Sequence, residues 1–348
     1  MSRNPKYIEL ADSILALIRE KGLKNGEKLL SEKNLAESFK VNHLTIRKAL
    51  ALLESRGCIN KIPSKGSFVG KASKNGTGRG LIGVLYPEDE TFYYEIFSGL
   101  ESRMALAGYS PVVHISRWSP EREKNILEKF ARLKVEGIIA VPNPECAVLY
   151  GNLETPVVFF DTYIEGMDIP YVITDDKEGA RMAVEHLVSL GHNKIAYIGS
   201  VHEKNSESRK SAYLEVLAKH GIRTVSNYFL EKEYSREWGY NAAGQLFQAL
   251  RGASPTAVFC GNDAIAAGVM SYLNSRQVGV PSQVSVMGFG NVGYSESLSL
   301  STVDQPRGRI TNAVWKNMRC LLAGQSTTGG TVIPTSLIVR KSSAAAKP

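Results

Sequence analysis

The sequence predicts two folded modules, an N-terminal winged helix-turn-helix of the α+β class and a larger α/β domain built from two lobes. Three observations support this fold class. Positive charge gathers in the first quarter of the chain, three helical patterns and a hairpin pattern follow one another there, and short apolar runs alternate with helical patterns downstream. The expected parts are a head at residues 1–70, a flexible linker at 71–80, the two-lobed domain at 81–341 and a disordered tail at 342–348.

The composition excludes several classes of protein. Of the 348 residues, 43% are hydrophobic and 22% are charged, which is typical of a soluble globular chain. We expect no membrane span, because no stretch approaches about 20 consecutive apolar residues, and the early charges argue against a signal peptide. The four cysteines lie far apart, without the spacing of a zinc or redox pair, which favours reduced thiols and a cytoplasmic protein.

The charge is divided unevenly along the chain. Residues 1–79 hold 16 Lys and Arg against 7 Asp and Glu, a net charge of +9, whereas residues 80–348 hold 26 against 27, a net charge of −1. This asymmetry predicts that the first module faces a polyanion and that the second faces something else. Nucleic acid and a membrane surface are both polyanions, so the local pattern must decide between them.

The local pattern of the basic module is that of a winged helix. The expected elements are helices at 5–21, 32–39 and 42–56 and strands at 58–62 and 67–70. Ser31 is an expected N-cap, and Gly57 is an expected C-terminal stop. The tight turn between the second and third helices indicates a helix-turn-helix. The apolar residues are used in a three-helix core, which disfavours an amphipathic membrane helix.

This module resembles the GntR family of winged-helix regulators. The phrases that carry the resemblance are Leu29-Leu30-Ser31-Glu32, Leu35-Ala36, Thr45-Ile46-Arg47-Lys48-Ala49-Leu50, Leu53-Glu54, Gly57 and Gly66-Ser67-Phe68-Val69. The apolar positions, both glycines and the wing agree in register over roughly residues 5–70. The resemblance implies that the second and third helices face an operator and that the wing tip reaches the minor groove.

The resemblance also implies which residues contact DNA. They are Lys33, His43, Leu44, Thr45 and Arg47, with Lys65 and Gly66 in the wing. Lys33 and Arg47 can neutralise phosphates, and Thr45 can bond a phosphate oxygen or a base edge. The family usually presents Arg and Thr where this chain has His43 and Leu44. Histidine offers one donor instead of a bidentate fork, and leucine can contact a thymine methyl, so we expect an operator that departs from the common half-site.

The pattern after the linker is that of a doubly wound α/β fold. Apolar runs predict buried strands at 81–86, 112–115, 137–141, 157–160, 195–199, 256–260 and 284–289. Helical patterns lie near 94–107, 120–134, 177–190, 206–220, 238–251 and 262–275. So long an alternation predicts two lobes rather than one sheet. The linker shows no helical pattern.

This second module resembles the LacI/GalR effector domain, and through it the periplasmic sugar-binding proteins. The phrases are Asp175-Asp176-Lys177-Glu178-Gly179-Ala180, His186-Leu187, Gly191-His192, Ile195-Ala196-Tyr197-Ile198-Gly199, Cys260-Gly261-Asn262-Asp263-Ala264-Ile265-Ala266-Ala267-Gly268, Val284-Ser285-Val286-Met287-Gly288-Phe289, Thr302-Val303-Asp304-Gln305-Pro306 and Leu337-Ile338-Val339-Arg340. The resemblance implies two lobes, three crossovers and a ligand in the cleft. Its union with the head is similar to the arrangement of arabinose-type repressors.

The resemblance implies an effector site at the carboxyl ends of the strands. The expected residues are Phe92, Tyr93, Asp161 at the first crossover, Arg209, Tyr234, Asn262, Asn291 and Gln305 after the crossover back. Aromatic rings can stack on a sugar while Arg, Asp and Asn bond its hydroxyls, so a monosaccharide or a derivative is the expected effector. Where the family commonly has Gly-Phe-Asp-Asp, this chain reads Gly288-Phe289-Gly290-Asn291, and Asp161 or Asn291 is the candidate to replace the missing carboxylate.

An enzymatic function is disfavoured. Gly288-x-Gly290-x-x-Gly293 has the spacing of a dinucleotide fingerprint, but no long amphipathic helix follows and no acidic residue lies about 20 positions on. No pair among the six histidines has the one-turn spacing of a helical zinc site. We therefore expect no cofactor and no metal.

Together these features predict a cytoplasmic, DNA-binding transcriptional regulator, acting as a repressor, whose effector binds between the two lobes. By family resemblance it is expected to be a homodimer that binds a near-palindromic double-stranded operator. The alternative is a sugar-binding sensor whose basic head binds nucleic acid nonspecifically or docks a protein partner.

Overall fold

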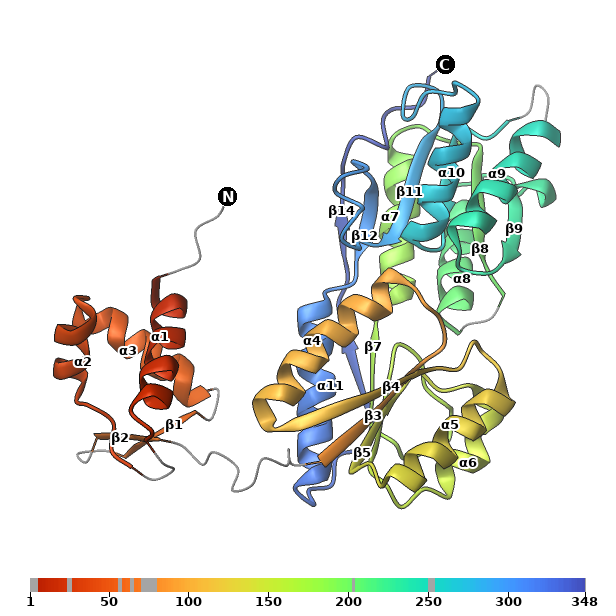
Figure 1. Cartoon of the computed structure of the whole chain (residues 1–348). Helices are drawn as coiled ribbons and strands as arrows, with labels where there is room; N and C mark the ends of the chain where they lie inside the picture. Colours follow the sequence, from red (N-terminus) through yellow and green to blue (C-terminus); the bar gives the residue numbers. More distant parts are fainter. Residues whose placement is uncertain are drawn as a thin grey trace. The chain divides into compact units, whose positions relative to one another are not determined.

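The computed structural model describes residues 6–23, 27–55, 58–62, 66–69, 80–201, 204–249 and 254–347. The chain forms two compact units, Met1–Ile82 with Glu101–Pro111, and Gly83–Leu100 with Val112–Pro348. The first unit contains the basic head, and the second contains most of the two-lobed domain (Figure 1).

Three helices build the head around an apolar core. They are α1 (Lys6–Glu20), α2 (Glu32–Phe39) and α3 (His43–Ser55). As the sequence predicts, Ser31 caps α2, because its side chain accepts a hydrogen bond from the backbone N–H of Asn34 at 3.1 Å. The side chains that the helices bury against one another include Ala11, Ile14, Leu35, Ile46, Ala49 and Leu53.

A hairpin follows the third helix. Its strands are β1 (Ile59–Ile62) and β2 (Gly66–Val69), which pair in antiparallel register with Asn60 opposite Phe68. The segment before α2 joins the hairpin, since the backbone N–H of Leu29 donates to the carbonyl of Ser67 at 2.8 Å. The expected wing residue Lys65 lies outside the described residues.

Two six-stranded sheets form the two lobes. The strand order is β13-β7-β6-β5-β3-β4 in lobe 1 and β14-β12-β11-β10-β8-β9 in lobe 2. Lobe 1 contains β3 (Gly80–Tyr86), β4 (Tyr109–Ile115), β5 (Gly137–Ala140), β6 (Val157–Phe160), β7 (Tyr171–Thr174) and β13 (Gly330–Ile333). Lobe 2 contains β8 (Ile195–Ser200), β9 (Phe229–Lys232), β10 (Ala257–Cys260), β11 (Ser285–Gly290), β12 (Ser301–Asp304) and β14 (Ser336–Ile338). The central pairs β5–β6 and β10–β11 are parallel, whereas β14 is antiparallel to β12.

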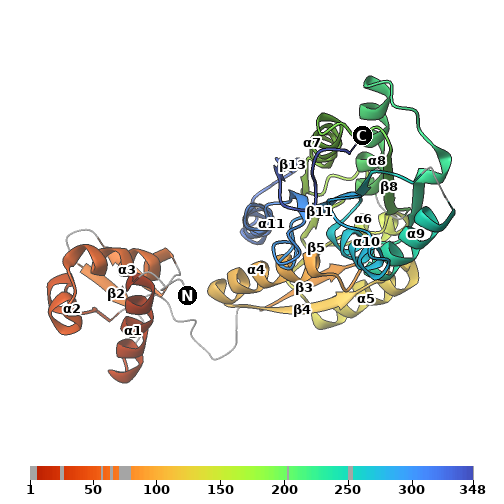
Figure 2. The same cartoon turned by 90° about the horizontal axis from the view of Figure 1, so that it is seen from above.

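Helices cover both faces of each sheet (Figures 1 and 2). In lobe 1, α4 (Thr91–Ala107) and α11 (Arg307–Leu322) lie on one face, and α5 (Pro120–Leu133) and α6 (Ala147–Gly151) lie on the other. In lobe 2, α7 (Asp176–Ser189) and α8 (Lys204–Lys219) cover one face, and α9 (Arg236–Ala249) and α10 (Asp263–Ser275) cover the other. Two single-turn helices, Pro144–Cys146 and Ser226–Tyr228, lie in connections. This arrangement is the predicted doubly wound α/β class.

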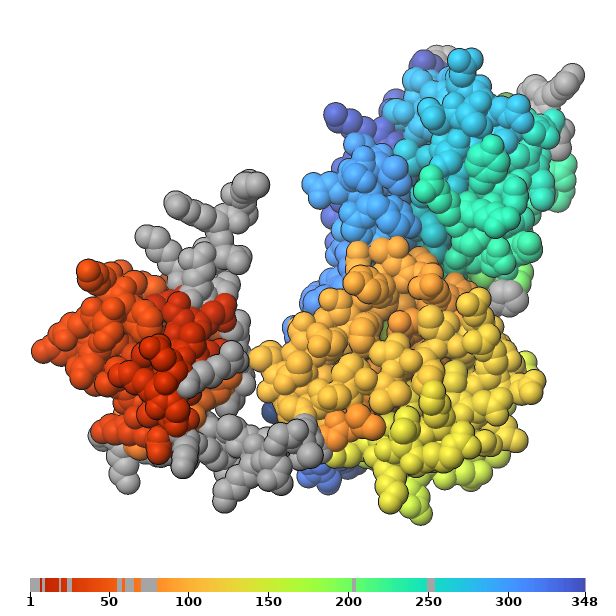
Figure 3. All heavy atoms as spheres, in the orientation of Figure 1, coloured from red at the N-terminus to blue at the C-terminus, as the bar shows by residue number. Residues whose placement is uncertain are grey.

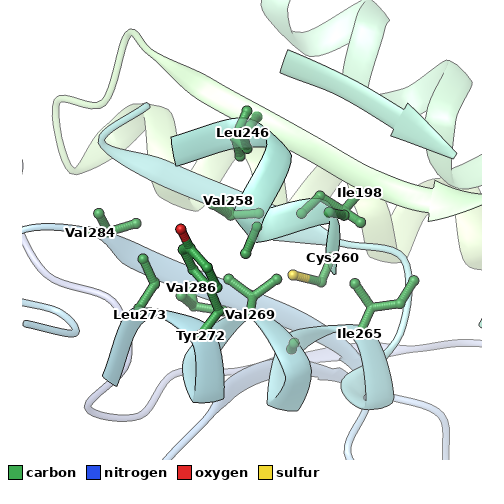
Figure 4. Packing of buried hydrophobic residues seen from close by; sticks show 14 of the residues in the cluster. Ile198, Leu246, Val258, Cys260, Ile265, Val269, Tyr272, Leu273, Val284 and Val286 are labelled. Atoms are coloured by element: carbon green, nitrogen blue, oxygen red, sulfur yellow. The ribbon is translucent and has the colours of Figure 1, made fainter. Parts of the chain in front are cut away.

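The core of lobe 2 illustrates why the sheet and its helices stay together (Figure 4). Val258 and Val286 on the strands face Val269 and Leu273 on α10, and all four side chains are fully buried. Burial of such a side chain stabilises the fold by roughly 1.5–3 kcal/mol. The strands are therefore almost continuously apolar, as parallel strands covered on both faces must be.

Along the described residues, the chain crosses between the lobes three times. The crossings follow β7, β12 and β13. Two of them are tied together, because the side-chain amide of Gln305 donates to the hydroxyl of Thr174 at 2.8 Å. Asp161 is not at a crossover, contrary to the sequence-based expectation. It lies between β6 and β7, which both belong to lobe 1.

Several elements were not expected from the sequence. They are the helix α11 and the short strands β7, β9, β12, β13 and β14. These strands mix polar with apolar residues, so they lack the continuous apolar runs that mark central strands such as β6 and β10. Residues 342–347, expected to be a disordered tail, run along lobe 2 instead. The Ser342 hydroxyl donates to the carbonyl of Val286 at 2.6 Å, and His192 contacts the carbonyl of Ala344 at 3.0 Å.

Candidate functional site

The start of α2 and the start of α3 form the basic face of the head. Lys33, His43, Leu44 and Arg47 are all exposed there. Leu44 is 69% exposed, although most apolar residues of the head are buried. The N-terminal end of a helix carries a partial positive charge, and positive side chains there add to it. This face is therefore suited to bind anions such as phosphate.

Glu32 organises the two basic side chains of α3. Its Oε2 lies 3.1 Å from Nε of Arg47 and 3.4 Å from Nε2 of His43. The Arg47 side chain is exposed, so its ion pair with Glu32 contributes little to stability and mainly orients the guanidinium. Thr45 is held differently, because its hydroxyl donates to the side chain of Asn42 at 2.7 Å, and its backbone N–H donates to the same oxygen at 2.8 Å.

Gly66 begins strand β2 with a φ of +109°. A side chain at this position would be strained, because L residues rarely adopt that conformation. A Cβ atom there would also lie 3.1 Å from Cε of Lys28, so this basic side chain lies beside the described end of the wing.

Seven of the eight expected effector residues line one cavity in the two-lobed domain. They are Phe92, Tyr93, Asp161, Arg209, Tyr234, Asn262 and Gln305. All follow the carboxyl ends of strands, where open α/β sheets bind ligands. The cavity itself has room for little more than a water molecule, about 20 Å³. A second cavity of about 460 Å³, open to solvent and sharing Glu90 and Tyr234, adjoins it, and its volume lies within the roughly 300–1,000 Å³ of small-molecule sites.

Arg209 is buried in the wall of this cavity. Its Nε and Nη2 lie 3.0 and 2.7 Å from Oδ2 of Asp176, and its Nη1 donates to the carbonyl of Gly261 at 2.6 Å. The guanidinium carbon lies 3.9 Å from the ring centroid of Phe289, in a cation–π contact. Both members of the ion pair are about 95% buried, so each neutralises a charge that would otherwise be unpaired inside lobe 2.

Asp161 is also held firmly. It adopts a φ of +65°, its Oδ2 accepts a hydrogen bond from the Tyr93 hydroxyl at 2.8 Å, and its carbonyl accepts one from the side chain of Asn205 at 2.7 Å. Burial, followed by the charge of Asp176, raises the pKa of Asp161 to about 6, although Arg209 and the hydrogen bonds act against this rise.

Glu90 faces Asn262 across the two lobes. The side-chain amide of Asn262 donates to Oε1 of Glu90 at 3.1 Å, while its own oxygen caps α10 by accepting from the N–H of Ile265 at 2.8 Å. Burial, followed by the charges of Glu88 and Asp161, raises the pKa of Glu90 to about 8. The cavity is therefore short of positive charge.

Asn291, the eighth expected residue, is not among the residues that line the cavity. Its side-chain amide donates to Oδ1 of Asp304 at 2.8 Å, and its oxygen accepts from Nη2 of Arg340 at 2.8 Å. Gly290 takes its place in the lining, with a φ of +127°. Asn291 was expected to face the effector, but its side chain bonds Asp304 and Arg340 instead of lining the cavity.

The glycine phrase at the end of β11 has a structural role. A Cβ atom on Gly288 would lie 2.2 Å from Oδ1 of Asp263, so only glycine allows that carboxylate to approach the strand. The carboxylate of Asp263 accepts hydrogen bonds from Ser295, Thr302 and the backbone of Val292. Turns rather than a helix follow the phrase, so no helix N-terminus is available there for a pyrophosphate.

Sequence reasoning missed Glu90, Phe289 and Asp176 in or behind the wall of the cavity. Glu90 belongs to the phrase Pro87-Glu88-Asp89-Glu90 directly after β3. An acidic phrase after the first strand of a parallel sheet was a usable signal, because that end of the strand faces the cleft.

Comparisons with known proteins identify both modules. Residues 6–69 match the gntR family of bacterial regulatory proteins. The head of the chain is therefore similar to this family. Residues 184–343 match the periplasmic binding protein-like domain. The union of these two modules is the one that the sequence predicts, and this regulator combines a helix-turn-helix head with a two-lobed effector domain.

One relative matches most of the chain, and another matches about half of it. The arabinose metabolism transcriptional repressor of Geobacillus stearothermophilus is 27% identical over 318 residues, which cover 87% of each chain. The probable HTH-type transcriptional repressor ExuR of Bacillus subtilis (strain 168) is 34% identical over 191 residues, covering 54% of this chain and 57% of its own. These relatives are repressors, and the prediction of a non-enzymatic regulator is confirmed.

Solved structures share the fold of the effector domain. The transcription regulator CcpA of Lactococcus lactis has a TM-score of 0.69 and 25% identity, covering 76% of this chain and 99% of its own. A dimeric Lac repressor with an 11-residue C-terminal deletion has a TM-score of 0.70 and 25% identity, covering 77% of this chain and 100% of its own. Among the described residues of the regulator, no helix combines the length and apolarity that crossing a membrane requires.

Proposed function

We propose that this regulator represses transcription from an operator that its head binds, and that a polar effector of monosaccharide size controls this binding from the cavity between the lobes. The observation that carries the proposal is the convergence of seven expected effector residues on one cavity in a chain with a GntR-type head. The name of the Geobacillus stearothermophilus relative supports both repression and a link to sugar metabolism.

The exposed basic face supports the DNA-binding half of the proposal. Lys33 and Arg47 neutralise phosphates and so supply affinity without sequence information. His43 and Leu44 are exposed on the same face, and we propose that they contact base edges and supply specificity. Glu32 restrains Arg47 and repels phosphate, so it lowers binding to random DNA. Thr45, Lys65 and Gly66 complete the proposed contacts.

A chain of hydrogen bonds supports coupling between the cavity and the crossovers. Arg209 bonds Asp176, Asp176 accepts from the Thr174 hydroxyl, and Thr174 accepts from Gln305. Thr174 and Gln305 lie at two of the three crossings. An effector that contacts Arg209 or Gln305 would therefore favour one angle between the lobes over another, which is the population shift that regulation requires.

We further propose that the regulator acts as a homodimer. The Lac repressor whose fold it shares is described as dimeric. In such a dimer each head binds one half of a near-palindromic operator, and a change in lobe angle alters the separation of the heads. Effector binding is proposed to release the operator.

Operator binding is tested with the full-length chain. An operator is selected from random duplexes, and its dissociation constant is compared with that of random DNA at physiological salt. We expect a preference of about a thousandfold or more. Lys33→Ala should weaken binding to all sequences alike, and His43→Ala should change the preferred bases. Lys124→Ala, on the exposed surface of α5, is the matched control.

The same experiment separates the alternative function. A merely basic head would bind the selected and random duplexes equally and lose both together as salt is raised. A thermal-shift screen of monosaccharides then tests the cavity, because a ligand that binds only the native state raises the melting temperature. A compound that stabilises the protein should also release the operator, and stabilisation without release would contradict regulation.

A further inference from the structure

The cavity between the lobes contains more negative than positive groups. Among the described residues that line it, Glu90 and Asp161 are acidic, and Arg209 is basic. Glu88 and Asp263 add negative charge from nearby. An excess of carboxylates in a small, partly dry space attracts cations and repels anions.

Arg209 is poorly placed to attract a negatively charged ligand. Three of its donor contacts go to Asp176 and to the carbonyl of Gly261. The ring of Phe289 covers the guanidinium, at 3.9 Å from its carbon. The charge of Arg209 is thus matched by that of Asp176 inside lobe 2, so a phosphate or a carboxylate would have to share the guanidinium with Asp176.

We propose, building on the function proposed above, that the effector has a protonated amine that binds between Glu90 and Asp161, and that the cavity rejects sugar acids and sugar phosphates. An amino sugar has this chemistry. Its ammonium supplies three donors to the carboxylates, and its apolar C–H face can stack on Phe92 or Tyr234.

The hydrogen bonds that the two acids accept come from neutral donors. The Tyr93 hydroxyl donates to Asp161 at 2.8 Å, and the Asn262 amide donates to Glu90 at 3.1 Å. Both acids follow strands of lobe 1, whereas Asn262 belongs to lobe 2. In the space-filling view the orange segment after β3 lies where the two lobes meet (Figure 3). The amine would thus bind lobe 1 and draw Asn262 of lobe 2 against it.

An amine and a neutral sugar should differ in whether their binding releases the proton of Glu90. The ionisable groups that act on Glu90 are Glu88, Asp161, Asp263, Arg209 and Tyr294, with Asp89 and Arg236 in the adjoining cavity. Burial and these acids raise the pKa of Glu90 to about 8. An ammonium stabilises the carboxylate form and so expels the proton of Glu90 near neutral pH. A neutral hydroxyl that accepts a hydrogen bond from protonated Glu90 expels none.

The test compares matched sugars on the full-length regulator by calorimetry. The probes are glucosamine, galactosamine and mannosamine, each with its neutral parent and its parent's 6-phosphate, at about pH 6.5, where the ammonium is charged. We expect at least one amine to bind roughly tenfold to a hundredfold more tightly than its parent, and the phosphates not to bind. Repeating the titration in buffers of different ionisation enthalpy should reveal proton release with the amine.

Glu90→Gln identifies the responsible group. This variant replaces the carboxyl group by a neutral amide of nearly the same shape, so it should fold, and it should abolish both the amine preference and the proton release. Glu128→Gln, on the exposed face of α5, should retain both properties. A fall in amine affinity without loss of the preference over the parent sugar would indicate a merely structural effect and overturn the assignment.

The outcomes separate this inference from the function on which it rests. A neutral sugar or a sugar phosphate that binds more tightly than the amine and releases the operator would overturn the inference and leave the proposed regulation standing. Failure of every probe to bind, with operator binding intact, would overturn both the amine and the monosaccharide-sized effector. If the unmodified protein showed no specific operator binding, this result would contradict the proposed function and not the amine inference.

Discussion

Breaking the buried ion pair of Arg209 and Asp176 should strongly destabilise the effector domain. Arg209→Ala removes two hydrogen bonds to Asp176, the bond to the carbonyl of Gly261 and the stacking on Phe289. The Asp176 side chain is 4% exposed, so water cannot replace the lost partner fully. The variant therefore leaves a nearly uncompensated charge inside lobe 2.

The expected loss in free energy of unfolding is about 3–5 kcal/mol, the usual effect of removing one partner of a buried pair. Asp176→Asn in the same background removes the orphaned charge. The double variant should therefore be more stable than Arg209→Ala alone, and the two single losses should not add. Arg209→Lys keeps the charge but not the bidentate geometry, so its loss should be intermediate.

Urea unfolding followed by tryptophan fluorescence measures these losses in the intact chain. The three tryptophans, Trp118, Trp238 and Trp315, all belong to the effector domain, so the signal does not report on the head. Additive losses in the double variant, or a loss below about 1 kcal/mol for Arg209→Ala, would refute the reasoning, because either result would mean that Asp176 finds another partner or reaches water.

Three further predictions concern pH, helix packing and the head. Burial raises the pKa of Glu90 to about 8, so the folded state holds that proton more tightly than the unfolded state does. The free energy of unfolding should therefore fall as pH rises from about 4.5 to 8, by at most about 1.4 kcal/mol per pH unit. Glu90→Gln should make the melting temperature depend less on pH, and an unchanged dependence would contradict the assignment. A Cβ on Gly268 would lie 2.1 Å from the carbonyl oxygen of Arg236, so Gly268→Ala should lower the free energy of unfolding by roughly 1–3 kcal/mol. Gly244→Ala is the control and should not lower it, because a Cβ there would meet Tyr272 at an ordinary contact distance of 3.5 Å. Ser31→Ala should destabilise the head by about 1 kcal/mol and Ser31→Asp should not, as measured by protease susceptibility of the head; equal susceptibility of all three proteins would show that the cap contributes nothing.

Much of the fold follows from short-range patterns in the sequence. Ser31 predicted the start of α2, and the tight turn before His43 predicted the helix-turn-helix. Continuous apolar runs predicted the central strands, because parallel strands covered on both faces have little room for polar side chains. The strands β9, β13 and β14 lack this signal, since edge positions are half-exposed.

The candidate cavity could be predicted in outline and not in detail. Seven residues could be placed there because the carboxyl ends of parallel strands meet at one edge of a sheet. Asn291 could not be excluded from sequence, because its direction depends on Arg340, which is 49 positions away. The importance of Glu90 was likewise hidden, since it arises from neighbours that come from other strands and from the opposite lobe.

The sequence by itself determined the two modules, their order, the charge of the head and the kind of site between the lobes. These properties depend on composition and on periodicity within one element, which neighbouring residues along the chain specify. Only the tertiary structure decided which carboxylates face the cavity, that Arg209 is engaged by Asp176, and that the last residues lie along lobe 2. The physical reason is that side-chain direction, burial and ion pairing are set by groups that folding brings together from distant parts of the chain.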